Sequence, residues 1–186
     1  MGLAEFEQRR DEKIDGVIYS MSPSPEYRHG IINGNIYAIV KRGLKNSICL
    51  VTIENLDFKY HSDINDDYVC PDVMIICDRK HLKGGSYSGV PKFIVETISH
   101  STAKRDRTEK KDIYEKAGVD EYWIVSPQGA VEIYYLQDGK YVLEQNYLLQ
   151  NDKEDDEYNA DIEICLKAFP NIKMTLGDIF EGLEQK

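Results

Sequence analysis

Two short hydrophobic segments of this chain each contain one carboxylate, and this feature most constrains its fold. The first segment is 71–76, with the sequence PDVMII, and the second is 92–99, with the sequence KFIVETIS. Their apolar, β-branched residues predict two buried strands. An ionised carboxylate in a buried strand is unfavourable unless another charge compensates it. A bound metal ion can compensate two carboxylates, and a metal with two carboxylates is typical of hydrolases.

The two-residue period of a strand allows the two carboxylates to converge. It places Asp72 on one face with Met74, and Glu96 on one face with Ile94. If the two strands are neighbours in a sheet, both acids can bind one Mg²⁺, with the backbone carbonyl of Thr97 and waters as further oxygen ligands. The alternative is that Asp72 ends its strand in a Pro-Asp turn and Glu96 pairs with a lysine.

The length and composition are those of a globular protein. The 186 residues are 41% hydrophobic and 30% charged, which predicts one domain over residues 1–186. No apolar run is long enough to span a membrane, and the charged N-terminus does not resemble a signal peptide. We therefore expect a cytoplasmic protein that contacts no membrane.

The cysteines show no metal-binding or redox motif. Cys49, Cys70, Cys77 and Cys165 have neither CxxC nor Cys/His spacing, and three of them lie in apolar segments. Buried free cysteines usually occur in such segments. The sequence therefore predicts four free thiols in a reducing compartment.

The net charge argues against a generic nucleic-acid binder. The formal net charge is −10, whereas affinity for nucleic acid comes largely from neutralising phosphates. The charges are unevenly distributed, because acidic residues gather in 151–163 and basic residues in 104–116. The local field over a site can thus differ in sign from the field of the whole protein.

The order of predicted elements is typical of an α/β or α+β fold with a central mixed sheet. The elements are a hairpin around Asp15-Gly16, a connector at 22–25, a helix at 26–45, strands at 47–54, 56–60, 68–77 and 92–99 with a mobile loop at 78–90, a helix from about 101 to 117, strands at 121–126, 131–137 and 140–149, an acidic loop at 151–160, a short strand, and a small helix at 176–182. Gly118 is expected to end the second helix.

The second helix extends its apolar face with two charged residues. Ile113, Tyr114 and Ala117 form the predicted core-facing stripe. Lys110 and Asp106 continue that stripe toward the N-terminus of the helix, because they are spaced three or four residues apart. A lysine there could orient an attacking water or stabilise the charge of a phosphorane. The alternative is an i,i+4 ion pair between Asp106 and Lys110 on a solvated face.

Other polar residues have two open interpretations. His29, early in the first helix, could contact a substrate phosphate or cap local backbone. Ser99, Ser101 and Thr102 could cap the second helix or bind phosphate at its N-terminus. The chain has no GxSxG, P-loop or GxGxxG motif, which argues against serine hydrolases, nucleotide hydrolases and dinucleotide enzymes. We therefore expect no organic cofactor.

These residues together resemble a known family. The Pro71-Asp72 step, the segment 94–102 and the ordered pattern over 105–125 resemble the Uma2 family of restriction-type endonucleases, within the PD-(D/E)xK superfamily. Asp15-Gly16, the step at 21–23 and His29 also fit, so the resemblance covers about residues 11 to 180. It implies a restriction-endonuclease-like α-β-β-β-α-β core, with a central mixed β-sheet flanked by helices and extra β-hairpins.

The resemblance also implies roles for particular residues. Asp72 corresponds to the motif aspartate, and Glu96 to the acid of the second half-motif. The lysine expected two residues after that acid is absent, because Ile98 occupies its place. Members of the family share this departure, and Lys110 on the following helix is the candidate replacement.

The activity that follows is a magnesium-dependent endonuclease that hydrolyses phosphodiester bonds in DNA. Asp72, Glu96 and the Thr97 carbonyl would hold the metal, and Lys110 would act beside it. Manganese is expected to substitute, since it accepts the same ligands. A homodimer is expected, because cutting two strands requires two sites.

Further residues are expected around this centre. Asp106 and Tyr114 would orient Lys110, and His29 and Ser99 would contact these side chains or the substrate. A catalytically silent binding or regulatory module on the same scaffold is the main alternative, supported by the acidic surface and by the lack of a DNA-reading element. A third possibility is a structural protein in which these charges are only ion pairs.

Overall fold

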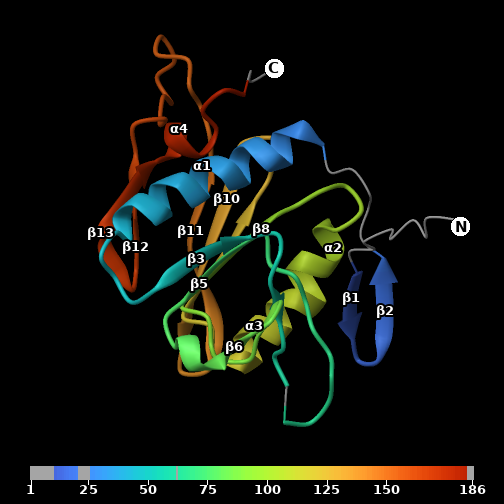
Figure 1. Ribbon diagram of the computed structural model, residues 1–186. Coiled ribbons are helices and arrows are strands. Elements are labelled where there is room, and N and C mark those ends of the chain that lie inside the picture. Colours follow the sequence, from blue (N-terminus) through green and yellow to red (C-terminus); the bar gives the residue numbers. More distant parts are fainter. Residues whose placement is uncertain (1–10, 21–25, 62, 184–186) are drawn as a thin grey trace, which may run out of the picture.

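The computed structural model describes residues 11–20, 26–61 and 63–183, and its centre is a six-stranded mixed sheet (Figure 1). The strand order is β11–β10–β9–β8–β5–β3. The strands are β3 (Leu50–Ile53), β5 (Val73–Ile76), β8 (Phe93–Thr97), β9 (Glu121–Val125), β10 (Ala130–Gln137) and β11 (Lys140–Leu148). All neighbours are antiparallel except β8 and β9, which are parallel because a helical segment connects them. The predicted central mixed sheet is confirmed.

Helices cover both faces of this sheet, which explains the continuous apolar runs of its central strands (Figure 1). Helix α1 (Tyr27–Gly43) covers one face with Ile32, Ile36 and Val40, which are fully buried. The opposite face is covered by the segment that connects β8 to β9, from which Tyr114 packs against Met74 and its neighbours. The order α1, β3, β5, β8, helix, β9 confirms the predicted α-β-β-β-α-β core.

The connecting segment differs from the single predicted helix. It consists of α2 (Ala103–Arg105), a π-helical turn (Asp106–Lys110) and α3 (Lys111–Ala117). Asp106 and Lys110, the two ends of the π-helical turn, are both buried against the sheet. π-helical turns inside helices are frequent at functional sites. Gly118, with φ of 83°, ends the segment as predicted.

The N-terminal hairpin lies beside α2, outside the main sheet (Figure 1). It comprises β1 (Asp11–Ile14) and β2 (Val17–Ser20). Asp15 and Gly16 form the predicted turn, with φ of 50° and 77°. The backbone of Lys13 exchanges hydrogen bonds of 2.8 and 2.9 Å with Tyr68. The predicted connector at 22–25 lies outside the described residues.

Two peripheral regions contain more strands than predicted. The predicted loop 78–90 contains a 3₁₀ turn (Arg79–His81) and the strands β6 (Leu82–Lys83) and β7 (Ser86–Tyr87), which pair beside β4 (Asp57–Phe58). The fully buried Tyr87 side chain anchors this small sheet. At the C-terminus a hairpin replaces the single predicted strand. It is formed by β12 (Glu163–Leu166) and β13 (Phe169–Thr175), and α4 (Leu176–Ile179) follows it.

The prediction of four free cysteines is wrong for two of them. Cys49 and Cys77 form a disulfide, whereas Cys70 and Cys165 are free. Leu50 pairs with Ile76 in the sheet, so the two cysteines come opposite each other one position further along. The thiol-based argument for a reducing compartment therefore no longer holds. Among the described residues, no helix is both long and apolar enough to cross a membrane.

We expect the Cys49–Cys77 disulfide to stabilise the fold measurably. The sequence separation is 28, and closing a loop of this size in the unfolded chain contributes about 3 kcal/mol. Reduction, or Cys49→Ser, should lower the melting temperature by about 6–12 °C. Thermal unfolding with and without a thiol reductant measures this difference, with Cys165→Ser as the matched control. Equal melting temperatures, together with four titratable thiols in the native protein, would contradict the disulfide.

A buried carboxylate on β9 predicts a pH-dependent stability. Glu121 accepts hydrogen bonds from Trp123 Nε1 and Lys167 N, both at 2.8 Å, and burial raises its pKa to about 7. The folded protein therefore binds this proton more tightly than the unfolded chain does. The contribution of Glu121 to stability is then greatest below pH 4.5 and falls as the pH rises to about 7.

Glu121→Gln should remove this pH dependence. Denaturant titrations at several pH values would give the free-energy difference between parent and variant. Between pH 4.5 and 7 that difference should change by about 3 kcal/mol, with the parent losing stability relative to the variant as the pH rises. Parallel pH profiles for the two proteins would show that Glu121 titrates normally.

Candidate active site

A cavity of about 440 Å³ lies where the hairpin, the start of α1, β8 and the α2 segment meet. An adjoining cavity of about 300 Å³ shares His29 and Ser99 with it. Acidic side chains outnumber basic ones in the lining of the larger cavity. Its charged and titratable residues are Glu12, Glu26, His29, Glu54, Cys70, Asp72, Glu96, His100, Arg105, Asp106 and Lys110. The cavity is therefore electronegative unless a further cation enters it.

The sheet brings the two predicted strand carboxylates together. Strands β5 and β8 are antiparallel neighbours in which Val73 pairs with Val95, so Asp72 and Glu96 occupy facing positions. They are 5% and 3% exposed, and both line the cavity. Asp72 Oδ2 accepts a hydrogen bond of 2.7 Å from Thr97 N. The predicted convergence of the two acids in one place is therefore observed.

Lys110 reaches the same place from the π-helical turn. Its Nζ lies 2.8 Å from Glu96 Oε1 and 2.8 Å from Glu12 Oε1, and it is 3% exposed. Asp106 Oδ1 is 3.8 Å away, beyond hydrogen-bond distance. Asp106 and Lys110 therefore form a long i,i+4 ion pair, but both residues are buried, so the alternative of a pair on a solvated face does not hold.

Tyr114 was expected to orient Lys110 directly, but its hydroxyl contacts Glu96 instead. Its hydroxyl donates a hydrogen bond to Glu96 Oε1, the oxygen that also accepts from Lys110. Among the described residues, the contacts of Glu96 all fall on Oε1, and those of the Asp72 side chain fall on Oδ2. The second oxygen of each carboxylate is the one with capacity for another ligand.

The pKa shifts indicate that the cluster lacks positive charge. Burial raises the pKa of Glu96 well above its ordinary value, although Lys110 opposes the shift. Burial likewise raises the pKa of Asp106, again against the effect of Lys110. For Lys110, burial favours the neutral amine, but Glu96 and Glu12 outweigh it and raise the pKa. One ammonium therefore does not fully compensate the surrounding carboxylates, and an added cation would be favoured.

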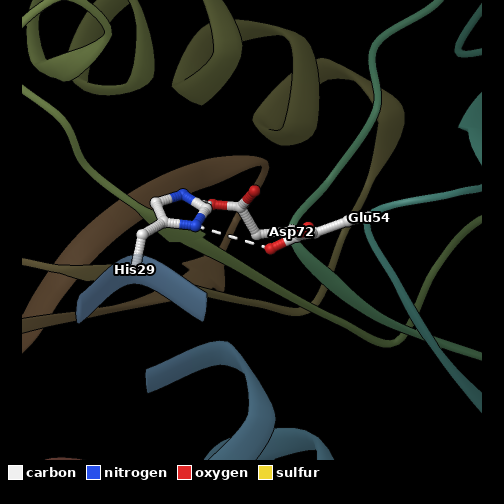
Figure 2. A group of neighbouring side chains, drawn as sticks. All are labelled: His29, Glu54 and Asp72. Atoms are coloured by element: carbon white, nitrogen blue, oxygen red, sulfur yellow. Dashed lines mark ion pairs between the residues drawn. The ribbon is translucent and has the colours of Figure 1, made fainter. Parts of the chain in front are cut away.

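His29, Glu54 and Asp72 form a second group at the edge of the cavity (Figure 2). Both acids contact the His29 ring from the same side, with Nε2 3.0 Å from Asp72 Oδ2 and Nδ1 3.4 Å from Glu54 Oε1. Burial opposes the charge on His29, but the hydrogen bonds to Asp72 and Glu54 outweigh it and raise its pKa to about 10. One ligand atom from each residue lies within 4.8 Å of the others, so the group could hold a metal ion.

Three residues of the site were not assigned a role from the sequence. Glu54 follows β3 with φ of 50°, and its N–H donates to the Asp72 carbonyl at 2.9 Å. Asn33 donates to Glu54 Oε1 at 2.7 Å and accepts from the Thr97 hydroxyl at 2.6 Å. Glu12 comes from the hairpin. The sequence places Glu54 at the end of the predicted strand 47–54, but it does not indicate that this strand pairs with the strand that follows Asp72.

Ser99 and Thr102 cap the turn before α2, whereas Thr102, at the N-cap of α2 itself, makes no side-chain cap hydrogen bond, so the predicted capping of the helix is not observed. Ser99 N donates to Thr102 Oγ1 at 3.0 Å, and Thr102 N donates to Ser99 Oγ at 3.2 Å. Ser101 Oγ lies 3.0 Å from Ser99 Oγ. All three residues also line the cavity, so the capped turn forms part of its wall.

The basic segment 104–116 contributes less positive charge to the cavity than its composition suggested. Arg107 is paired with Glu132, and the Lys111 ammonium lies 4.1 Å from the centre of the Tyr134 ring. Two basic residues of this segment, Arg105 and Lys110, line the cavity.

The order α1, β3, β5, β8, helix, β9 is that of the restriction-endonuclease-like fold. The Uma2 family model, described as "Putative restriction endonuclease", matches residues 3–161, and the chain belongs to this family. Over 184 residues the chain is 29% identical to "Uncharacterized protein slr1290" of Synechocystis sp., covering 96% of this chain and 89% of that protein. The predicted family resemblance is confirmed, and family and fold together support a nuclease.

A solved structure shares the fold. A crystal structure from Anabaena variabilis, described as "a putative nuclease belonging to DUF820", superposes with a TM-score of 0.68. The match covers 93% of this chain and 90% of that chain at 17% sequence identity. At this identity the likeness demonstrates the common fold only.

Proposed function

We propose that the protein is a nuclease that hydrolyses phosphodiester bonds in DNA with the help of Mg²⁺. The observation that carries the proposal is the convergence of Asp72, Glu96 and Lys110, from three separate segments, on one electronegative cavity. Family membership supports the reaction type. The excess of buried carboxylates supports a divalent cation, which has the charge that the cavity lacks.

Asp72 is the proposed centre of cation binding. Its facing partner Glu96 and, on the other side, Glu54 supply further carboxylate oxygens, which Mg²⁺ prefers. The Thr97 carbonyl remains a proposed oxygen ligand. His29 could become a ligand only by releasing the proton that Asp72 and Glu54 stabilise, and it would then suit Mn²⁺ better than Mg²⁺. When bound, the cation would polarise the scissile phosphate and make an attacking water more acidic.

The proposed role of Lys110 follows from its hydrogen bonds. An ammonium group has three N–H donors, and two of them are directed to Glu12 and Glu96. With Asp106 beyond hydrogen-bond distance, the third donor can hold the attacking water or the phosphate oxygen on which negative charge develops. Asp106 then tunes the charge around Lys110 from one turn away.

The substrate would approach over the wall formed by the capped turn. Ser99 and Ser101 offer hydroxyl groups to phosphate, and Arg105 offers a guanidinium group at the same wall. We propose a homodimer as the working form for duplex DNA, because one cavity can cut only one strand at a time. Light scattering on the purified protein tests that state.

Nicking of supercoiled plasmid tests the proposed function. The protein with Mg²⁺ or Mn²⁺ should convert supercoiled plasmid to the open circle, and a chelator should stop the reaction. Glu96→Gln, purified in the same way, should lose the activity and so exclude a contaminating nuclease. Glu163→Gln is the matched control, because Glu163 pairs with Lys173 on the exposed surface.

The outcomes separate the candidate functions. Cleavage by the parent and by Glu163→Gln, but not by Glu96→Gln, supports the nuclease. No cleavage of duplex or single-stranded DNA, together with no calorimetric binding of Mg²⁺ or Mn²⁺, contradicts it. That second result would favour the silent binding module, in which Lys110 and His29 permanently neutralise the acids.

A further inference from the structure

We propose that Glu12, on the N-terminal hairpin, is a positioning residue that holds the Lys110 ammonium in its working place. This makes the hairpin part of the active site, although it lies outside the central sheet. The inference rests on the proposed function of Lys110 and extends it to a residue that no motif indicated.

The first support is the geometry of the Glu12 carboxylate. Glu12 is 2% exposed and lines the cavity. Its Oε1 accepts from Lys110 Nζ at 2.8 Å and from Cys70 N at 3.0 Å. Cys70 stands two residues before Asp72, so Glu12 ties Lys110 to the backbone that leads into the proposed metal ligand.

The second support is the geometry around Lys110. Glu12 and Glu96 both lie 2.8 Å from Nζ, and together they fix two of its three donors. Without Glu12, the long lysine side chain could swing toward Asp106, which is now 3.8 Å away. When two N–H donors of the ammonium are fixed, the third N–H points in one defined direction. A group that acts on a bound substrate requires such a defined orientation.

The third support is the attachment of the hairpin. Gly16 N donates to Asp67 Oδ1 at 3.1 Å, and the Arg105 guanidinium lies 4.0 Å from the centre of the Tyr19 ring. Lys13 exchanges backbone hydrogen bonds with Tyr68. These contacts hold both strands of the hairpin, so the position of Glu12 is determined by more than its own ion pair.

Simple neutralisation of Lys110 does not account for Glu12. Glu96 already supplies one negative charge at 2.8 Å, and Asp106 supplies another nearby. A third buried carboxylate adds negative charge to a cavity that already has an excess of it, and the Arg105 guanidinium, 4.0 Å from Glu12 Oε2 and partly exposed, offsets that charge only in part. Glu12 instead adds a second acceptor at 2.8 Å, from the hairpin, and so restricts an orientation of the ammonium that Glu96 alone would leave free to rotate.

Steady-state nicking by three variants tests the proposal. Glu12→Gln keeps the side-chain length and an acceptor for Cys70, and its kcat should fall by about 10- to 100-fold. KM and the Mg²⁺ concentration for half-maximal rate should stay within about threefold, because substrate and cation binding are untouched. Glu12→Asp keeps the charge but withdraws the carboxylate, so it should remain impaired. Asp66→Asn breaks a different ion pair of the hairpin, the one with Lys13, and should retain the parent kcat.

Several results would overturn the proposal. Parent-like kcat in Glu12→Gln would do so, as would full activity in Glu12→Asp, which would reduce the role of Glu12 to its charge. Equal losses of kcat in Glu12→Gln and Asp66→Asn, with lowered melting temperatures for both proteins, would indicate that Glu12 acts only by stabilising the hairpin.

A chemical readout separates this proposal from the proposed function. Acylation of Lys110 by acetic anhydride, followed by mass spectrometry, reports the confinement of the side chain without any cleavage assay. Modification should be slow in the parent and at least about fivefold faster in Glu12→Gln, because the released ammonium visits the solvent-filled cavity. If the parent does not cleave DNA, the proposed function fails. Independently of cleavage, an equal rate of Lys110 acylation in the parent and in Glu12→Gln would show that Glu12 does not confine the Lys110 side chain.

Discussion

Replacing Lys110 by methionine is expected to lower the free energy of unfolding by about 3–5 kcal/mol near neutral pH. Lys110 is 3% exposed and is the cation that lies between the buried carboxylates of Glu12, Glu96 and Asp106. Methionine fills similar space but leaves these acids uncompensated. The melting temperature should fall by about 6–20 °C, and urea denaturation gives the free energy directly.

The pH dependence of this loss follows from the shifts in the cluster. Burial already raises the pKa values of Glu96 and Asp106, so they protonate more readily than ordinary carboxylates. Protonated acids need no ammonium partner, and the cost of Lys110→Met should therefore shrink as the pH falls. Lys173→Met, which breaks an exposed pair with Glu163, should change stability by less than about 1 kcal/mol. Equal effects of the two substitutions would show that Lys110 is not confined among the acids.

Asp72→Asn is expected to reduce cation-dependent plasmid nicking by at least about 100-fold. Asp72 is the residue shared by both groups of acids, since it faces Glu96 across the sheet and contacts His29 beside Glu54. Asparagine can still accept the hydrogen bond from Thr97 N, so the fold should be retained. Its neutral amide, however, binds a divalent cation far more weakly than a carboxylate does.

Cation binding provides a second measurement for the same substitution. Saturating Mg²⁺ or Mn²⁺ should raise the melting temperature of the parent but not that of Asp72→Asn, because a ligand stabilises only a state that binds it. Asp120→Asn is the matched control, since Asp120 is a partly exposed aspartate paired with Lys92. Undiminished nicking or an undiminished thermal shift in Asp72→Asn would place the cation elsewhere.

The parts of the site that depend on local periodicity were predictable. Asp72 and Glu96 interrupt apolar runs, and the alternation of a strand fixes which face each occupies. Lys110 extends the stripe of Ile113, Tyr114 and Ala117, and its burial was one of the two interpretations that helical spacing left open. The structure confirms these placements, and the turns at Asp15-Gly16 and Gly118, because each depends on a few neighbouring residues.

The parts that depend on long-range contacts were not predictable. Glu54 joins the site because β3 pairs with β5, and Glu12 joins it because the hairpin docks beside α2 (Figure 1). The disulfide arises from the same β3–β5 register, over a separation that forms no local motif. Periodicity gives the face of each element, but it does not give the register of one element against another.

A crystal soaked in Mn²⁺ tests most directly whether the cavity holds a cation beside Lys110. Anomalous diffraction should show one strong peak about 2.0–2.3 Å from a carboxylate oxygen of Asp72, within reach of Glu96 or Glu54. Anomalous density confined to the acidic surface at 151–163, with nothing beside Asp72 at saturating Mn²⁺, would contradict a metal-dependent nuclease centred on this cavity.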